Sequence, residues 1–355
     1  MKKIKEYLKR LFIDGLSGMA TGLFATLIIG TIIAQIGAYI PGKIGEFIVL
    51  VGKTAQFVMG AGIGAGVAIK YKQAPLTIIS AAVCGMVGAY ASQIIAGTVI
   101  KDGLINLRSP GEPLGAFVAA YVGIEIGRLV AGKTKIDIIL TPLVSISAGS
   151  AVGLLVGPPV SAFMSWLGGI INWATEQQPF VMGIVISVLM GMFLTLPISS
   201  AAIGVSLGLS GIAAGAATVG CCANMVGFAV ISFRENKAGG LISQGIGTSM
   251  LQMPNIVKHP QIWLPAIITS AILGPVSTLL VKMQGNPIGS GMGTSGLIGP
   301  IMSFTTMTEA GEPVWLVIIK IVVMYVVLPA LISLGISEFM RKKGWIKEGY
   351  LSLSV

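Results

Sequence analysis

The sequence contains very little charge. Only 10% of its 355 residues are Asp, Glu, Lys or Arg, whereas a soluble domain usually carries about 25%. A water-exposed surface cannot be built from so few charged side chains, so the composition excludes an ordinary soluble protein. The 54% of hydrophobic residues instead predict that lipid surrounds most of the chain.

Residues that bind metals or perform catalysis are also scarce. The chain has one histidine, His259, and three cysteines within apolar runs: Cys84, Cys221 and Cys222. A lone histidine supplies neither a metal site nor a catalytic triad, and the cysteine spacing fits neither zinc binding nor a disulfide framework. No Walker loop follows a strand. We therefore expect no cofactor, no metal and no catalytic centre in the chain.

Long apolar runs are abundant. A membrane helix needs roughly 20 successive apolar residues, and the runs predict an all-α integral membrane protein with about ten transmembrane helices. The expected spans are 16–40, 44–69, 74–100, 114–131, 137–160, 179–200, 203–233, 238–256, 261–283 and 313–338. The 49 glycines predict close packing, because small residues let helices approach each other in lipid.

Two intervals differ from ordinary loops. Residues 161–178 and 285–312 are too apolar for water and too rich in Gly, Pro, Ser and Asn for a regular helix. We predict two re-entrant hairpins, which membrane depth tolerates where protein or a wet cavity surrounds them. The first hairpin ends a first membrane half, 16–178. The second hairpin lies within a second membrane half, 179–338.

Positive charge gathers at both ends of the sequence. Nine of the 23 Lys and Arg residues lie in a basic, amphipathic segment 1–15 and a basic tail 339–355. Such charge marks the cytoplasmic side and meets anionic headgroups, so both tails are predicted to be cytoplasmic and no nucleic-acid partner is expected. Dividing 203–233 into two short spans would give eleven spans and leave the Arg341-Lys342-Lys343 cluster outside, which favours ten.

Similar residue pairs occur in the same order in two parts of the chain, which suggests an internal duplication. The matches are Gly123-Ile124 with Gly245-Ile246, Pro142 with Pro265, Met164-Ser165 with Met302-Ser303, Thr175-Glu176 with Thr308-Glu309, and Leu196-Pro197 with Leu328-Pro329. The repeat is parallel if there are ten spans and inverted if there are eleven. Its polarity stays open.

The repeated Thr-Glu element is the strongest local signal for a binding site. Thr175-Glu176 and Thr308-Glu309 each close a predicted hairpin just before a long apolar helix. Each glutamate could simply face water near a helix N-terminus, where the dipole favours negative charge. Recurrence at matching places favours ligand binding instead, and carboxylates suit sugars because each can accept hydrogen bonds from neighbouring hydroxyls.

Amide side chains in the predicted eighth span offer further ligands. Such groups more often join helices by hydrogen bonds, but Asn255 follows Pro254 at a helix end that is expected to be unwound, and Gln252 lies nearby. We predict a substrate site where the two Thr-Glu elements meet Gln252 and Asn255, with Glu309 as the first choice of ligand.

Glu125 and Arg128 form a further charged pair. They lie at i and i+3 on the fourth predicted span, so they face the same side and can form an ion pair. Neutralisation of an arginine near the cytoplasmic end is the simpler explanation, and a role in transport coupling is the alternative.

Over nearly its whole length the chain resembles the EIIC membrane component of the bacterial sugar phosphotransferase system. It is most similar to the stand-alone branch named after a perfringolysin O regulator. Met307-Thr308-Glu309 is the nearest match to the Gly-Ile-Thr-Glu motif of glucose-type members, although Gly-Ile is not present. The resemblance implies that Glu309 binds the sugar.

The same resemblance implies a permease for a sugar or similar small polar solute, with separate EIIA and EIIB subunits supplying phosphate. The 17-residue segment after residue 338 is too short to fold into such a domain. It also implies a homodimer. The alternative function, suggested by the name of the branch, is a ligand-sensing membrane regulator of gene expression that does not transport.

Overall fold

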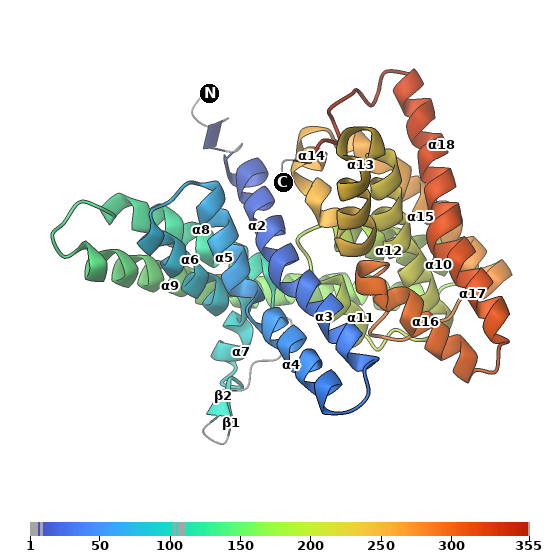
Figure 1. The fold of residues 1–355 in the computed structure, drawn as a ribbon, viewed down its shortest axis with the longest axis horizontal. Helices are drawn as coiled ribbons and strands as arrows, with labels where there is room; N and C mark the ends of the chain where they lie inside the picture. Colours follow the sequence, from blue (N-terminus) through green and yellow to red (C-terminus); the bar gives the residue numbers. More distant parts are fainter. Residues whose placement is uncertain (1–5, 8–9, 102–103, 106–110, 354–355) are drawn as a thin grey trace. The chain divides into compact units, whose positions relative to one another are not determined.

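We describe the fold from a computed structural model, in which residues 6–7, 10–101, 104–105 and 111–353 are placed (Figure 1). The predicted basic residues Lys2, Lys3, Lys5 and Lys9 lie outside these residues. The chain divides into two compact units, Met1–Ser165 and Trp166–Val355, and each is described by itself.

The described chain is almost entirely helical, and six of its helices are long and apolar enough to cross a membrane. A seventh crossing results if the bent pair Lys43–Phe57 and Met59–Lys70, which meet at 52°, counts as one span. The prediction of an all-α membrane protein is confirmed. The expected number of ten spans stays a prediction.

Unit 1 consists mainly of helices that are interrupted by short π-helical turns. Its elements are η1 (Arg10–Gly15), α2 (Leu16–Leu23), η2 (Phe24–Ile28), α3 (Ile29–Ala38), α4 (Lys43–Phe57), α5 (Met59–Lys70), α6 (Pro75–Ala89), α7 (Ala91–Ile95), β1 (Ile100–Lys101), β2 (Leu104–Ile105), α8 (Pro113–Val130) and the first part of α9 (Asp137–Thr175). Strands β1 and β2 pair antiparallel.

A glycine ladder along α5, residues 60–66, sets the packing of unit 1. Two of its glycines lie against Gly18 and Gly22 of α2, and the two that alternate with them lie against Ala81 and Gly85 of α6. A Cβ atom at any of the four would overlap the facing backbone. The ladder therefore lets α5 pack closely against two helices at once, as small residues do in lipid.

Helix α9 is continuous where the sequence predicted a break. It runs for 39 residues through Pro158 and Pro159 and ends at Thr175. The interval 161–178 is thus helical for most of its length, and the prediction of an irregular segment there was wrong. Proline and glycine are tolerated in membrane helices because neighbouring groups can satisfy the freed backbone atoms, so they were weak evidence for a hairpin.

Unit 2 has a more broken course. After the end of α9 its elements are α10 (Pro179–Thr195), α11 (Ser200–Ser206), α12 (Gly211–Ile231), α13 (Phe233–Ile242), η3 (Ser243–Gly247), η4 (Ser249–Gln252), α14 (Met253–Lys258), η5 (Pro260–Trp263), α15 (Leu264–Pro275), η6 (Val276–Val281), η7 (Ser295–Leu297), α16 (Ile298–Glu309), α17 (Val314–Val322), η8 (Val323–Val327) and α18 (Leu328–Lys342). Helix α12 lies at its centre, with nearly all residues buried.

Helices α10 and α12 run in the same direction. Ser187 of α10 lies against Gly220 of α12, and two turns later the Oγ1 atom of Thr195 lies 3.2 Å from Oδ1 of Asn224. Consecutive helices that are parallel must be joined by a segment that travels back. Residues 196–210, which include the short α11, form this return segment.

The predicted eighth span, 238–256, is not a continuous helix. It is divided among α13, η3, η4 and α14, and Lys237 has a left-handed backbone conformation (φ 52°). The Nδ2 atom of Asn236 and the Nε2 atom of Gln252 donate to the same acceptor, the carbonyl of Leu351. Since both ends of the segment reach one atom, it turns back on itself rather than crossing the unit.

Candidate functional site

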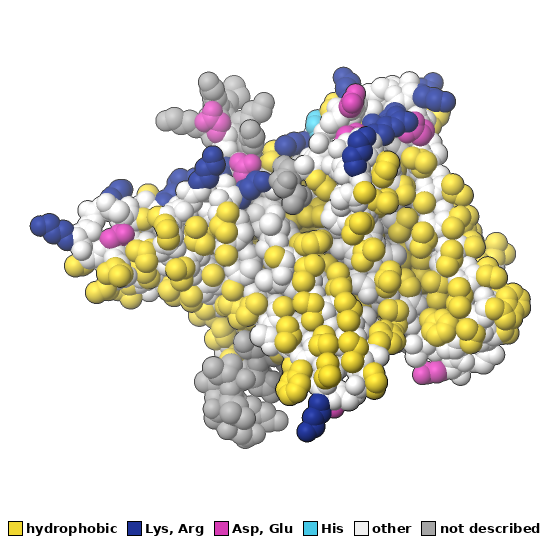
Figure 2. All heavy atoms as spheres, viewed as in Figure 1, with side chains coloured by type: hydrophobic (Ala, Val, Ile, Leu, Met, Phe, Trp, Pro, Cys, Tyr) yellow, Lys and Arg dark blue, Asp and Glu magenta, His cyan; other side chains and the backbone are white. Residues whose placement is uncertain are grey.

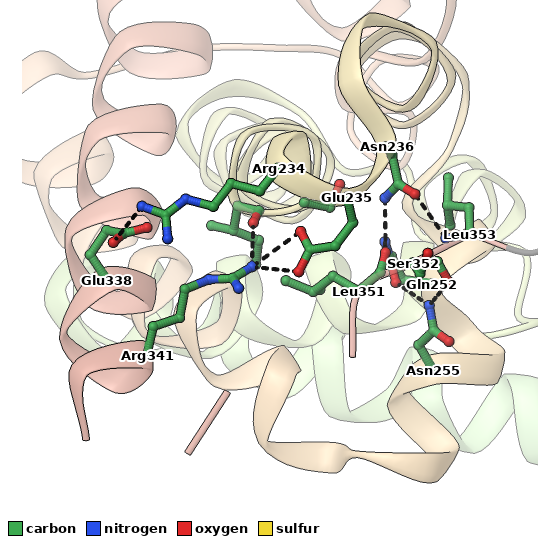
Figure 3. Close-up of polar contacts among 12 residues, drawn as sticks. Arg234, Glu235, Asn236, Gln252, Asn255, Glu338, Arg341, Leu351, Ser352 and Leu353 are labelled. Atoms are coloured by element: carbon green, nitrogen blue, oxygen red, sulfur yellow. Dashed lines mark hydrogen bonds and ion pairs between the residues drawn. The ribbon is translucent and has the colours of Figure 1, made fainter. Parts of the chain in front are cut away.

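Gln252 and Asn255 hold the C-terminal tail, which we define as residues 343–353 (Figure 3). Gln252 is fully buried, and its Nε2 donates to Oε1 of Gln244 and to the carbonyl of Leu351, each over 2.9 Å. Asn255 donates from Nδ2 to Oε1 of Gln252 and to the carbonyl of Ser352, each over 2.8 Å. In this conformation both amides bind protein groups.

Asn236 completes the binding of the tail. Its Nδ2 donates to the carbonyl of Leu351, and its Oδ1 accepts from the backbone N–H of Leu353, both over 2.8 Å (Figure 3). His259 stacks on Tyr350 with ring centroids 3.7 Å apart. We call this end of unit 2 the tail end.

Two ion pairs strengthen the tail end. Arg341 and Glu235 lie 2.9 Å apart with side chains that are 10% and 4% exposed. Arg234 and Glu338 are separated by the same 2.9 Å but are 64% and 33% exposed. Figure 3 shows the two pairs joining α13 to α18.

The two Thr-Glu elements lie at the opposite end of unit 2, the hairpin end. Thr175 and Thr308 each donate their hydroxyl to a carbonyl of their own helix, over 2.6 and 2.7 Å respectively. Glu176 and Glu309 are exposed. The carbonyl of Pro179, three residues after Glu176, accepts from Thr278 in η6, directly after α15, which fixes the place of this element.

The predicted meeting of all these residues therefore does not occur. The helix formed by α17, η8 and α18 separates the two ends, and its 29 residues, Val314–Lys342, span about 40 Å at 1.5 Å per residue. Gln252 and Asn255 cannot contact the same small ligand as Glu309 in this conformation. The expected convergence depended on a membrane-crossing eighth span.

A second glutamate of the Thr308 element has a partner that the sequence analysis missed. Glu312 accepts from Nζ of Lys320 over 2.7 Å, and the side chains are 22% and 18% exposed. Lys320 lies within the apolar helix α17, where a charged group is costly without a partner. The pair ties the end of the 285–312 segment to α17, and a lysine inside an apolar run was the signal for it.

Glu125 and Arg128 lie in unit 1 and contact each other at 2.6 Å between Oε2 and Nη2. Oε1 of Glu125 is also 3.0 Å from Nη2 of Arg10, whose guanidinium lies 4.4 Å from the ring centroid of Tyr71. The carboxylate thus balances two arginines. This arrangement agrees with a structural role, and a role in coupling stays a prediction.

Two segments that contain only short helical pieces, α11 and η7, meet beside α12 in unit 2. One is the return segment 196–210, and the other is 282–297. The hydroxyl of Ser200 donates to the carbonyl of Gly291 over 2.7 Å, and the N–H of Gly285 donates over 3.1 Å to the carbonyl of Gly211, which directly follows the return segment. Since the residue numbers rise in one segment as they fall in the other, the two segments run antiparallel.

The second segment rises along α12 and then returns. Gly285 lies against Ala214, Gly293 lies against Cys221, and Thr294 contacts the sulfur of Met225 at 3.5 Å. Helix α16 then leads back, with Gly299 against Thr218. Residues 285–309 therefore form a hairpin along α12, which we call the α12 hairpin. Its entry from one membrane face stays a prediction.

The tip of the α12 hairpin has an unusual backbone. Gly293, Gly296 and Leu297 all have left-handed conformations, with φ of 51°, 55° and 59°. Such a conformation in a residue with a side chain costs on the order of 1–3 kcal/mol, and strained residues of this kind cluster at ligand clamps and switch regions. Leu297 therefore marks the tip as a candidate functional position.

Polar groups line the place where the two segments meet. Oδ1 of Asn286 accepts from the N–H of Gly289 over 3.0 Å, and Thr218 donates to the carbonyl of Gly289 over 3.4 Å. The buried hydroxyl of Ser295 has no hydrogen-bond partner among the described residues. Unwound backbone at this depth offers donors and acceptors that a continuous helix would use internally.

The family model described as "Phosphotransferase system, EIIC" matches residues 13–353. This chain belongs to the EIIC family. No curated protein matched it in the comparison made. The resemblance to the EIIC component is thereby confirmed, whereas the branch stays a prediction, and this EIIC protein is a multi-pass membrane component of sugar transport. The return segment is the part of this EIIC protein that the sequence analysis did not predict, because it treated 179–200 and 203–233 as successive spans. Pro197 and the glycines at 208 and 211, where the backbone is left-handed, were the available signals for the return segment.

Proposed function

We propose that this EIIC protein binds and translocates a sugar or a similar small polar solute, and that the solute binds where the return segment meets the α12 hairpin. The observation that supports this most is the antiparallel pairing of two broken segments beside the buried helix α12. Transporters typically form solute sites from interrupted helices, because the freed backbone groups can bind the solute.

The exposed glutamates are the proposed entry ligands. Glu309 ends α16 at the foot of the α12 hairpin, and Glu176 lies at the same end of unit 2. A carboxylate accepts charge-assisted hydrogen bonds from hydroxyls, which are about twice as strong as neutral ones. Thr175 and Thr308 position these glutamates by closing the preceding helix turn, so their role is indirect.

Charge supports a cytoplasmic tail end. Seven basic residues lie there: Arg234, Lys237, Lys258, Arg341, Lys342, Lys343 and Lys347. Outside the Glu312–Lys320 pair, the hairpin end has Lys282 together with Glu176 and Glu309. Since positive charge stays on the cytoplasmic side, we infer that the C-terminus is cytoplasmic and that solute reaches the α12 hairpin from outside.

Phosphate transfer is assigned to separate EIIA and EIIB subunits, as the family implies, and a homodimer is the expected assembly. The alternative of a regulator that does not transport gains no support from the fold or the family. A binding site in a transporter of this type needs affinity for the solute but no catalytic centre of its own.

The test is solute binding to the purified protein. After a thermal-shift screen of sugars, titration calorimetry should show that Glu309→Gln weakens binding by about 5- to 150-fold, the equivalent of a lost charged hydrogen bond of 1–3 kcal/mol. Gly204→Val should weaken it further, because a side chain there would crowd Ser290 and Pro287 of the α12 hairpin.

Glu348→Gln is the matched control, since Glu348 is an exposed tail carboxylate at the other end of unit 2. Its affinity should equal that of the wild type. Glu176→Gln shows whether the second Thr-Glu element contributes. Unchanged affinity in both Glu309→Gln and Gly204→Val would refute the proposed site.

A further inference from the structure

A groove of about 500 Å³ opens on the surface of unit 2, between the end of α12, both ends of α13, and α18. Its lining residues are Val230, Phe233, Arg234, Leu241, Leu334 and Glu338. The aromatic ring and both leucines are exposed, so the described protein does not cover the walls. Apolar walls of this kind need an apolar occupant.

The groove lies at the boundary between two chemical zones. Val230 is next to the last residue of one candidate span, Gly211–Ile231, and Leu334 lies two turns before the end of another, Val314–Lys342. Just beyond it come the basic residues of the tail end. Figure 2 shows lysines and arginines of unit 2 above a band of hydrophobic side chains. In a bilayer this is the level at which headgroups meet acyl chains.

The mouth of the groove presents both signs of charge. The Arg234–Glu338 contact joins one guanidinium nitrogen to one carboxylate oxygen. A guanidinium has five N–H donors and a carboxylate about four acceptor positions, so each group can bind a further partner without breaking the contact. Exposed ion pairs are also worth only about 0–1 kcal/mol, so a small shift of this pair costs little.

We propose that the groove binds one phospholipid whose headgroup carries a phosphate and a primary ammonium, that is, a phosphatidylethanolamine. An acyl chain lies along Val230, Leu241 and Leu334. Arg234 donates to the phosphate, and Glu338 accepts from the ammonium. A choline headgroup has no N–H to donate, and a glycerol headgroup brings no positive charge to the carboxylate, so both fit less well.

The bound lipid joins α13 to α18 at the tail end. Phe233 and Leu241 belong to α13, whereas Leu334 and Glu338 belong to α18. An occupied groove therefore adds to the contact that Arg341 and Glu235 make between the same two helices. Loss of the lipid should lower the thermal stability of the tail end without changing the α12 hairpin.

The test uses delipidated, full-length protein in detergent. Phosphatidylethanolamine, phosphatidylcholine and phosphatidylglycerol with identical acyl chains are titrated separately, and bound lipid is counted by native mass spectrometry. We expect one tightly bound phosphatidylethanolamine, and about tenfold weaker binding of the other two, as for the loss of one charged hydrogen bond. Arg234→Gln and Glu338→Gln should each reduce the phosphatidylethanolamine affinity by a similar factor.

Leu241→Trp tests the groove itself, because it fills the apolar wall and leaves both charged residues in place. It should abolish the tight site, whereas Lys342→Gln, an exposed residue outside the groove lining, should leave it unchanged. Unfolding temperatures without lipid verify that each variant is folded. Equal retention of the three lipids, tighter binding of phosphatidylglycerol, or an unchanged tight site in Leu241→Trp would overturn the proposal.

Discussion

The two ends of unit 2 use polar groups in opposite ways. At the tail end, side-chain amides bind the main chain of the tail, and a buried ion pair joins Arg341 to Glu235. At the hairpin end, carboxylates are exposed and the polar groups beside α12 belong largely to an unwound backbone. A network of partnered side chains stabilises a single conformation. An interrupted helix instead leaves backbone N–H and C=O groups available to bind a ligand.

The largest effect should come from the buried ion pair at the tail end. Glu235→Gln leaves Arg341 without a charged partner, and removing one member of a buried pair costs about 3–5 kcal/mol. Unfolding in detergent without added lipid should show this loss. Glu338→Gln, which breaks the exposed pair between the same helices, should cost at most about 1 kcal/mol. Similar losses in the two variants would contradict the contrast between buried and exposed pairs.

A larger side chain at the contact between the return segment and the α12 hairpin should lower both stability and transport. Gly291→Val forces a side chain onto the backbone of Ser200, and overpacking costs about 1–3 kcal/mol. Solute uptake into vesicles should fall together with the unfolding temperature. Gly335→Ala is the control, since no atom lies within 4 Å of the added Cβ. Normal uptake in Gly291→Val would separate the contact of the two segments from transport.

Loss of the tail-binding amide should have a smaller effect. Asn236→Ala removes two hydrogen bonds to the tail, at about 0.5–1.5 kcal/mol each. Limited proteolysis should cut the tail faster in this variant, while Asn172→Ala, at an exposed position of the hairpin end, should behave as wild type. Equal cleavage rates for Asn236→Ala and the wild type would show that other contacts suffice.

The smallest effect concerns pH. Burial against its neighbours and then the charge of Lys258 lower the pKa of His259 below its usual 6.5. The neutral ring is therefore favoured in the folded state. Its contribution to folding stability is present above pH 6.5 and is lost as the pH falls through the lowered pKa. Accessibility of a cysteine placed at Ser352 should rise slightly on acidification, and His259→Gln should remove this rise. An identical rise in the variant would assign it to other groups.

Much of the fold could be predicted because lipid imposes simple rules. Apolar runs of sufficient length predicted α12 and the helix that ends in α18, and the abundance of glycine predicted close helix packing, as seen along α5. These features depend on composition along one helix. The hairpin shape of 285–309 was also expected, because its glycines and prolines prevent a regular helix over the first part.

The remaining errors came from contacts that no local pattern contains. The apolar content of 238–256 predicted a span, but Gln252 and Asn236 bind the same carbonyl more than 90 residues later in the chain. The interval 161–178 contains Gly168 and Gly169, yet α9 continues through both glycines to Thr175. The first error placed Gln252 and Asn255 together with the Thr-Glu elements. The sequence analysis did not predict the Glu312–Lys320 pair, which forms across the turn between α16 and α17.

The amides of the tail end bind main-chain carbonyl and N–H groups, which every amino acid except proline supplies. Lys347 and Glu348 are exposed, whereas Ile346 and Leu351 are buried. Substitutions at the exposed positions should thus be neutral in a deep mutational scan. Deleting or inserting one residue between Ile346 and Leu351 would instead move every later carbonyl out of register with Asn236 and Gln252. The length of the tail is therefore constrained far more than the identity of its exposed residues.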